Sequence, residues 1–237
     1  MDFYQTPIHP CGYIPKRYSV NIFADPNGEI STRTYSWLID RGFRRNGSHL
    51  YKPHCPDCKA CVPTRVAVAD FKPSRSQKRV LARNQDLQIQ ETQKEFKQEH
   101  FELYKRYLED RHNDGPMTSS TQEDYEDFIL GSWSDTRFIE FRLEEKLISV
   151  AVFDVLPQGL SAAYTYFDAA YQNRSLGTLA ILKLIEQTQL ENLEYVYLGY
   201  WIKECQKMSY KTNFAPVEGY VNKNWQRLTV EKKLGIS

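Results

Sequence analysis

The sequence predicts an α+β fold in which a block of consecutive strands is flanked by helices. Three segments rich in β-forming residues, Arg137 to Leu143, Lys146 to Val155 and Leu160 to Phe167, follow one another with short breaks. A helical pattern then opens near Gly177, and a further strand pattern ends at Gly199. Strands in succession, followed by a helix and another strand, are typical of α+β proteins.

The first 71 residues form a block of short elements around a cysteine cluster. Tyr18 to Phe23 predicts a strand, and Asp25-Pro-Asn-Gly28 is a strong turn signal. Apolar residues at helical spacing predict a short helix that closes near Gly42. We expect an N-terminal domain over residues 1–71 and a larger domain over residues 72–237. Further strands are expected at Leu50-Tyr51 and at Thr64 to Val68.

Three cysteines in the first block form a CxxCxxC cluster. Thiolates at that spacing can share one soft metal ion, because a tight turn brings the sulfur atoms together. Cys11 is the leading candidate for a fourth ligand, and His54 and His9 are weaker candidates. Zinc and an iron–sulfur cluster both suit thiolates, and the competing interpretation is reduced thiols that pack a loop. The predicted metal ligands are Cys11, Cys55, Cys58 and Cys61.

A basic stretch between Phe71 and Asn84 contains no acidic residue. A helix that begins near Ser74 places arginines at positions i, i+4 and i+8, along one stripe. The ordinary interpretation of a charge run is a solvated face, but the lack of acidic residues favours contact with a phosphate backbone. The residues predicted to contact a phosphate backbone are Arg75, Lys78, Arg79 and Arg83, with Arg44 and Arg45 as candidates to extend the stripe.

The rest of the larger domain alternates helix and strand patterns. Leu87 to Glu91 predicts a short strand, and Val217 to Val221 predicts a final one. The helix near Gly177 follows a loop beside a buried strand, so its first backbone N–H groups are suited to an anion. Beyond Gly199, the sequence predicts a crossing segment and a second helix. Aromatic residues alternate with lysines there, a pattern that favours a pocket for a ring and a phosphate. Two further helices are expected around Phe101, Tyr104 and Leu108, and around Tyr125, Phe128 and Ile129.

The overall composition limits the classes of partner and compartment. The chain has 237 residues with 31 Lys and Arg against 30 Asp and Glu, so binding of any nucleic acid requires a local basic patch. No apolar run approaches the roughly 20 residues of a membrane span, and the N-terminus lacks the pattern of a secretory signal. Five cysteines, three of them clustered, fit a reducing compartment. We therefore expect a cytoplasmic protein with no membrane partner.

Seven motifs, which together span nearly the whole chain, carry a family resemblance. They are FRRNGSHLYKPHCPDCKACVPTRV (Phe43 to Val66), PSRSQKRVLARN (Pro73 to Asn84), RHNDGPM (Arg111 to Met117), LSAAYTYFD (Leu160 to Asp168), SLGTLAI (Ser175 to Ile181), YVYLGYWI (Tyr195 to Ile202) and CQKMSYK (Cys205 to Lys211). The chain resembles the arginyl-tRNA–protein transferase family, most closely its bacterial branch of aspartate/glutamate leucyltransferases. The predicted element order also resembles the GNAT acyltransferase fold, preceded by a smaller cysteine-containing domain.

The resemblance implies a function. Members of this branch transfer leucine from leucyl-tRNA to proteins or peptides with an N-terminal Asp or Glu. The product is a degradation signal for a downstream N-degron adaptor, and no cofactor is required. The alternatives are a non-catalytic tRNA or N-degron binding protein on the same fold, and an acetyl-CoA N-acetyltransferase. The latter is disfavoured by Leu179, which stands where the phosphate loop of such enzymes has a small residue.

The implied reaction, acyl transfer from an activated ester, suggests roles for individual residues. Positioning of the reactants supplies most of the catalysis, and Asp168 is either a proton acceptor or a turn cap. An acidic side chain needs a cation such as Arg142 or Arg174. We expect His112 to cap a helix and Cys205 to be a buried thiol. The predicted catalytic residues are Asp168, Tyr200, Lys207 and Tyr210, and the predicted substrate-binding residues are Arg142, Arg174, Gly177, Thr178, Trp201 and Lys211.

Overall fold

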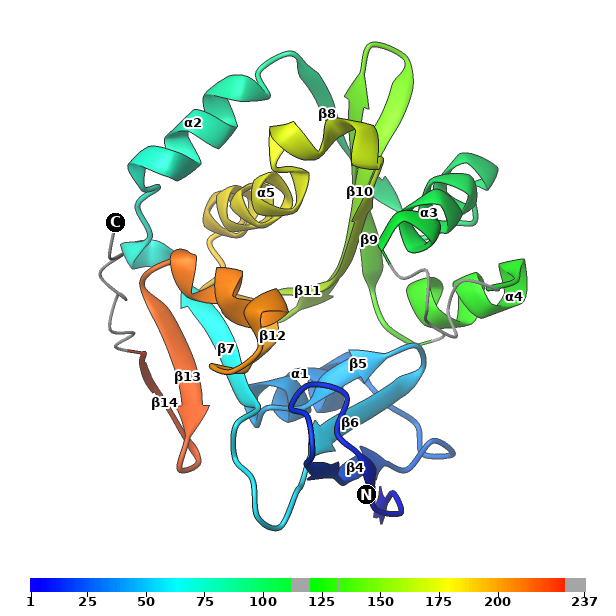
Figure 1. The fold of residues 1–237 in the computed structure, drawn as a ribbon, viewed down its shortest axis with the longest axis vertical. Coiled ribbons are helices and arrows are strands. Elements are labelled where there is room, and N and C mark those ends of the chain that lie inside the picture. Colours follow the sequence, from blue (N-terminus) through cyan, green and yellow to red (C-terminus); the bar gives the residue numbers. More distant parts are fainter. Residues whose placement is uncertain (112–119, 132, 229–237) are drawn as a thin grey trace.

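The computed structural model describes residues 1–111, 120–131 and 133–228. An eight-stranded sheet forms its centre, with the strand order β14-β13-β7-β12-β11-β10-β9-β8 (Figure 1). β11 and β12 pair in parallel, whereas the other neighbouring strands pair in antiparallel orientation. These strands are β7 (Val62–Ala67), β8 (Leu87–Gln93), β9 (Thr136–Leu143), β10 (Lys146–Leu156), β11 (Gly159–Phe167), β12 (Tyr195–Trp201), β13 (Val217–Val221) and β14 (Asn224–Arg227).

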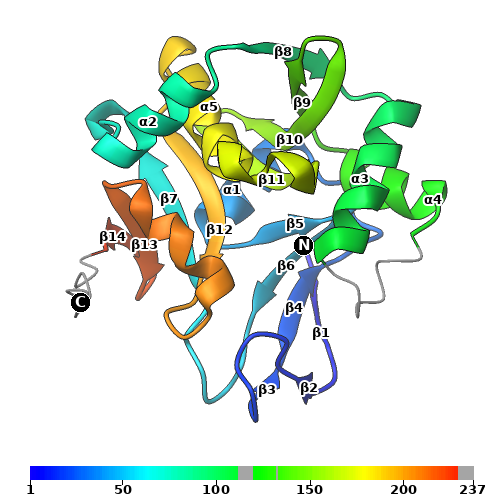
Figure 2. The same ribbon diagram turned by 45° about the horizontal axis from the view of Figure 1, so that its top comes forward.

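Helices cover both faces of this sheet (Figures 1 and 2). α2 (Arg75–Arg83) and α5 (Leu176–Leu190) lie together on one face. α3 (Gln98–Arg111) and α4 (Gln122–Tyr125) lie on the other face. The central strands are therefore buried on both sides, which explains why β10 reads as the nearly continuous apolar run LISVAVFDVL.

Alternate residues of β10 supply two separate cores. Val150 and Val152 pack in the cluster that α3 and α4 complete, whereas Ala151 and Phe153 pack in the cluster that α5 completes. This division follows from the two-residue period of a strand, which points successive side chains to opposite faces. The predicted α+β class and its run of three strands are confirmed.

Local signals set several element boundaries. Ser74 caps α2, because its hydroxyl accepts a hydrogen bond from the Gln77 amide at 3.3 Å. The Gln77 side chain accepts one from the Ser74 amide at 2.8 Å in return, which completes a capping box. Ser31 caps α1 (Thr32–Asp40), because its hydroxyl accepts a hydrogen bond from the Thr34 amide at 3.1 Å. The chain turns away after this helix at Gly42, which has a φ of +86°.

A second layer, built from the N-terminal residues, packs against one end of the large sheet (Figure 1). It contains α1 and a four-stranded sheet of order β1-β4-β6-β5. Arg45 of β5 forms a buried ion pair with Asp154 of β10, with 2.7 Å between Nε and Oδ2. Tyr35 of α1 donates to the same carboxylate at 2.6 Å. The strands of this layer are β1 (Phe3–Gln5), β4 (Asn21–Ala24), β5 (Arg44–Asn46) and β6 (His49–Pro53), beside a small pair β2 (His9–Pro10) and β3 (Tyr18–Ser19).

The structure differs from the sequence-based expectations in two helical segments. The helix expected after Gly199 is the 3-10 segment η5 (Gln206–Asn213). The helix expected around Tyr125 and Ile129 divides into α4 and the π turn η3 (Glu126–Leu130). Two further 3-10 turns are η1 (Val68–Asp70) and η4 (Ala169–Arg174).

The division of the chain near residue 71 stays a prediction. β7 comes from the N-terminal segment, yet it lies inside the large sheet between β12 and β13. Within the ranges that the structure describes, no helix is both long enough and apolar enough to cross a membrane.

Candidate functional site

The separation of β11 from β12 forms the centre of the candidate site. The two strands pair in parallel only at their beginnings in the described chain, and the last pair joins Ser161 to Tyr197. β12 then shifts register against β7 between Tyr197 and Gly199, where Gly199 has a φ of +82°. Glycine adopts this backbone conformation without the strain that a side chain would cause. We call residues 162–167 of β11 and 198–201 of β12 the splayed strands.

Arg44, from β5 of the N-terminal layer, reaches into the splayed strands. Its Nη1 donates to the Ser161 hydroxyl at 3.1 Å, and its Nη2 donates to the Ala162 carbonyl. Gly199 makes room for this guanidinium, because a β-carbon at position 199 would lie 3.0 Å from Arg44 Nε. Arg44 therefore binds β11 where the pairing with β12 ends.

Lys211, from η5, is a second cation at the splayed strands. The residue is 6% exposed, and its Nζ donates to the Tyr200 carbonyl at 2.6 Å. Burial lowers the pKa of Lys211 to about 7, and the charge of Arg44 adds to that shift. A buried amine with this pKa loses and gains its proton near neutral pH.

Aromatic side chains stand around these two cations. Tyr107 of α3 packs against Phe167 at the end of β11, with 5.2 Å between ring centroids. Burial raises the pKa of Tyr210, and the charge of Arg44 opposes this shift. Tyr210 as a whole is 43% exposed. Trp201, at the end of β12, is partly exposed, as a ring that stacks on a base would have to be.

The first turn of α5 adjoins the same strand ends. Ser175 precedes it with a φ of 58°, and within the described chain no side chain caps the helix. Within the described chain, a β-carbon at Gly177 would have Phe167 Cε1 of β11 as its nearest neighbour, at 3.9 Å, so the space beside it is open. The Thr178 amide donates to the Ser175 carbonyl at 3.0 Å. Leu179 is 1% exposed and belongs to the core.

Two predicted catalytic residues have structural partners. The Tyr200 hydroxyl donates to the Gly42 carbonyl at 2.8 Å, so it points towards the N-terminal layer. Asp168 accepts a hydrogen bond from the Ala170 amide at 3.0 Å and pairs with Lys146 at 2.9 Å. Burial opposes its ionisation, but these contacts lower the pKa of Asp168 overall. Lys207, the fourth predicted catalytic residue, is exposed on η5. The catalytic roles stay predictions.

The two arginines expected to bind an acidic substrate are already paired with carboxylates. Arg174 holds Asp86 through two hydrogen bonds of 2.8 Å. Arg142 binds Glu140 at 2.8 Å and also contacts Glu99. Substrate binding by either residue would have to displace these partners.

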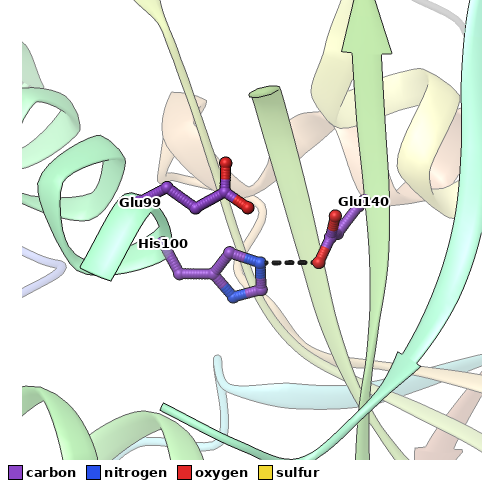
Figure 3. A group of neighbouring side chains, drawn as sticks. All are labelled: Glu99, His100 and Glu140. Carbon is purple, nitrogen blue, oxygen red and sulfur yellow. Dashed lines mark hydrogen bonds and ion pairs between the residues drawn. The ribbon is translucent and has the colours of Figure 1, made fainter. Parts of the chain in front are cut away.

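Glu140 lies in a compact polar cluster between α3 and β9 (Figure 3). Its Oε1 is 2.9 Å from His100 Nε2 and 2.8 Å from Lys97 Nζ. Burial opposes ionisation of Glu140, but hydrogen bonds from Lys97, Arg142 and His100 outweigh it and lower its pKa to about 2. Glu99 completes a group with ligand atoms close enough for a metal ion. Two cations already occupy this position, so we assign the cluster to packing of α3.

The cysteines of the predicted metal site lie near one another. Burial raises the pKa of Cys61 to about 12, and the neighbouring thiols Cys55, Cys11 and Cys58 contribute to the shift. Among the described residues, the group with three ligand atoms within 4.8 Å of one another is the Glu140 cluster rather than the cysteines. The metal site stays a prediction. Cys205 is partly buried.

The basic stripe lies on the outer side of α2. Arg75, Lys78 and Arg79 are exposed, while Gln77 and Val80 are buried on the opposite side. None of these three cations forms an ion pair within residues 1–111, 120–131 and 133–228. Arg83 is exposed as well, but it donates to the Asn173 carbonyl.

Sequence reasoning missed the place of two arginines. Arg44 and Arg45 were expected to extend the basic stripe of α2. Arg44 instead reaches the splayed strands, and Arg45 is buried against Asp154. Neither contact has a local signal, since the partners are more than a hundred residues apart in sequence. The predicted helix cap His112 lies outside the described residues.

Two models of one protein family, and curated relatives, match the sequence of this chain. Residues 99–221 match the family model for the C terminus of arginine-tRNA-protein transferase, and residues 9–79 match the model for its N terminus. An aspartate/glutamate leucyltransferase of Pseudomonas aeruginosa strain LESB58 is 46% identical over 229 residues, which cover 97% of each chain. One of Pseudomonas fluorescens strain Pf0-1 is 46% identical over 225 residues, covering 95% of this chain and 96% of the relative.

A solved structure shows a similar fold at low sequence identity. The structure of L-PGS from Bacillus licheniformis matches with a TM-score of 0.50 and 12% identity. The match covers 68% of this chain and 59% of that chain. Both family models and relatives that match over nearly their whole length identify the protein: this chain belongs to the arginine-tRNA-protein transferase family.

Proposed function

We propose that the protein transfers leucine from leucyl-tRNA to the N-terminal Asp or Glu of proteins and peptides. One observation carries this proposal. Relatives named aspartate/glutamate leucyltransferase match 97% of the chain at 46% identity, and the match includes both the N-terminal layer and the splayed strands. The resulting peptide bond marks the acceptor for degradation through an N-degron adaptor, and the cytoplasm is the compartment that we propose.

The reaction needs little chemistry from the protein. The acceptor's α-amine loses a proton and attacks the ester carbon of leucyl-tRNA. The new C–N bond forms as the C–O bond to the terminal ribose breaks, and the ribose hydroxyl leaves with a proton. Because a free α-amine has a pKa of about 7.7 to 8.0, a weak base suffices to deprotonate it. Holding both substrates in line supplies most of the rate increase.

The finer fold assignment, a GNAT-like acyltransferase fold, is part of this proposal. Three features support it: the antiparallel run β9-β10-β11, the helix α5 that follows it, and the parallel strand β12 that diverges from β11. In this arrangement the start of α5 adjoins the splayed strands. Its N–H groups are suited to a phosphate of the tRNA 3′ end. The exposed cations of α2 are suited to the phosphate backbone elsewhere in the tRNA.

A transfer assay with a matrix of substrates tests the proposal. Labelled leucyl-, arginyl- and phenylalanyl-tRNA are each incubated with peptides that differ only at residue one. We expect label to enter peptides that begin with Asp or Glu, from leucyl-tRNA. Binding of tRNA or acidic peptides without transfer would instead support the non-catalytic binding protein. Acetyl transfer from acetyl-CoA would support the acetyltransferase, which the buried Leu179 disfavours.

A further inference from the structure

Arg44 differs from the other well-placed arginines because no carboxylate neutralises it within the described chain. Arg45 is paired with Asp154, Arg142 with Glu140, and Arg174 with Asp86. Arg65 is paired with both Asp40 and Glu218. Arg44 donates to two neutral oxygens, the Ser161 hydroxyl and the Ala162 carbonyl.

A guanidinium has five N–H donors, and two hydrogen bonds leave part of that capacity unused. Lys211 stands nearby, and its contacts are also neutral: the Tyr200 carbonyl at 2.6 Å and the Met208 sulfur at 3.4 Å. Holding a charge on buried Lys211 beside the partly buried Arg44 without a counter-ion is costly. An incoming anion relieves that cost, so this arrangement favours anion binding.

Two features of the fold fix the position of the Arg44 guanidinium. Gly199 leaves the space that its guanidinium occupies, because a side chain there would collide with Nε, Cζ and Nη2 at 3.0 to 3.3 Å. The Ser161 hydroxyl and the Ala162 carbonyl then orient the group from β11. A cation that β11 orients in a space left by β12 is preorganised for a ligand that enters between the two strands.

We infer that Arg44 binds the side-chain carboxylate of the acceptor's N-terminal Asp or Glu, with Lys211 as the second positive group beside it. This inference rests on the proposed function. It assigns to Arg44 the recognition of the acidic acceptor residue in that reaction. The planar guanidinium matches a carboxylate in geometry. A tRNA phosphate is the other source of an anion, but the first turn of α5 already offers N–H groups suited to a phosphate.

The test compares acceptor peptides that begin with Asp and with Asn, using wild type, Arg44→Gln and Arg44→Lys. The measured quantity is the ratio of kcat/KM for the two peptides. Because both values come from the same preparation, the ratio does not depend on the folded fraction. We expect Arg44→Gln to lower the ratio about 10- to 100-fold, the effect of losing a charged hydrogen bond. Arg44→Lys should restore part of it.

Two further variants complete the design. Lys211→Met should lower the same ratio to a smaller extent, and it keeps the test open if the Arg44 variants do not fold. Arg137→Gln is the matched control, since that arginine pairs with Glu91 and Asp135 on the same sheet and has no role in the proposed site. It should leave the ratio unchanged.

The outcomes separate failure of this inference from failure of the proposed function. No transfer to Asp peptides by wild type would contradict the proposed function itself. Normal transfer by wild type with an unchanged Asp-to-Asn ratio in Arg44→Gln would overturn the inference alone. An unchanged ratio together with a raised KM for leucyl-tRNA would assign Arg44 to a tRNA phosphate and would also overturn it.

Discussion

Asp168 directly follows β11 beside the splayed strands, and its carboxylate has two structural contacts. It accepts a hydrogen bond from the Ala170 amide at 3.0 Å and pairs with Lys146 at 2.9 Å. These contacts outweigh burial and lower the pKa of Asp168. A carboxylate with a lowered pKa is a weaker base, so the geometry favours the turn cap over proton transfer.

We therefore expect Asp168→Asn to keep its transfer rate within a few-fold of wild type from pH 6 to 9. Asparagine forms the same turn contact, and the pair with Lys146, whose own side chain is 54% exposed, contributes little to stability. Initial rates across this pH range, with leucyl-tRNA affinity as the control, decide the question. A large loss at pH 6 that recovers towards pH 9 would instead make Asp168 the proton acceptor.

Glu140 predicts a pH dependence of stability. Hydrogen bonds from Lys97, Arg142 and His100 overcome the opposing effect of burial and lower its pKa from 4.5 to about 2. Because the folded-state pKa is the lower one, the stabilisation is complete above about pH 4.5 and is lost as the pH falls towards 2. The shift corresponds to about 3 kcal/mol.

Urea unfolding at pH 6 and pH 3 measures this effect. Wild type should lose much of this free energy of unfolding between the two values, whereas Glu140→Gln should be less stable at pH 6 and change less with pH. Asp86→Asn removes a carboxylate from an exposed pair and serves as the control. Equal pH dependence in wild type and Glu140→Gln would contradict the assigned role.

At the scale of elements, α2 presents three cations without acidic partners in the described chain: Arg75, Lys78 and Arg79. We expect the double variant Arg75→Ala, Arg79→Ala to bind tRNA more weakly and with a shallower salt dependence. Each lost contact with duplex phosphates should reduce the log–log slope by about 0.9. Titrations at several salt concentrations measure it. Arg33→Ala, Arg41→Ala is the matched control, and an unchanged slope in the α2 variant would reject this surface.

The sequence predicts those elements whose signals are local. α2 begins directly after Ser74, where the sequence predicts the start of a helix, and the three strands from Thr136 to Phe167 follow directly from alternating or apolar runs. The structure of the segment after β12 could not be predicted in the same way. η5 is a 3-10 segment in which Lys211 is buried against the Tyr200 carbonyl. Lysine and tyrosine in a polar stretch give no sign of that burial.

The site was predictable in part for the same reason. The break at Gly199 and the open helix start at Gly177 both have local glycine signals. The structure places Gly199 within the splayed strands and Gly177 beside Phe167 at the end of β11. The contact of Arg44 with Ser161 joins residues 117 positions apart. Likewise, nothing local shows that Asp86 and Glu140 neutralise the arginines that looked most suitable for an acidic substrate.

At the scale of the whole molecule, one buried ion pair joins the N-terminal layer to the large sheet. Arg45 and Asp154 have side chains 3% and 0% exposed, and Tyr35 and Thr136 donate to the same carboxylate. This ion pair matters for function because Arg44 directly precedes Arg45 in β5. A shift of the layer would move Arg44 away from the splayed strands.

We expect Asp154→Asn to destabilise the protein by about 3–5 kcal/mol, since it leaves the Arg45 charge buried without a counter-ion. Urea unfolding measures the change. Lys183→Ala, which removes an exposed pair with Glu186, is the control and should change stability by less than about 1 kcal/mol. Similar unfolding free energies for the two variants would contradict the role of the Arg45–Asp154 ion pair.

The most direct test of the central claim is to identify the product of the purified protein by tandem mass spectrometry. Leucyl-tRNA is supplied with a peptide that begins with Asp or Glu, and with the same peptide acetylated at its α-amine. We expect the free peptide to gain one leucine, linked by a peptide bond to its N-terminal residue. The acetylated peptide should gain none. Leucine attached elsewhere, or no leucine in the free peptide, would contradict the central claim.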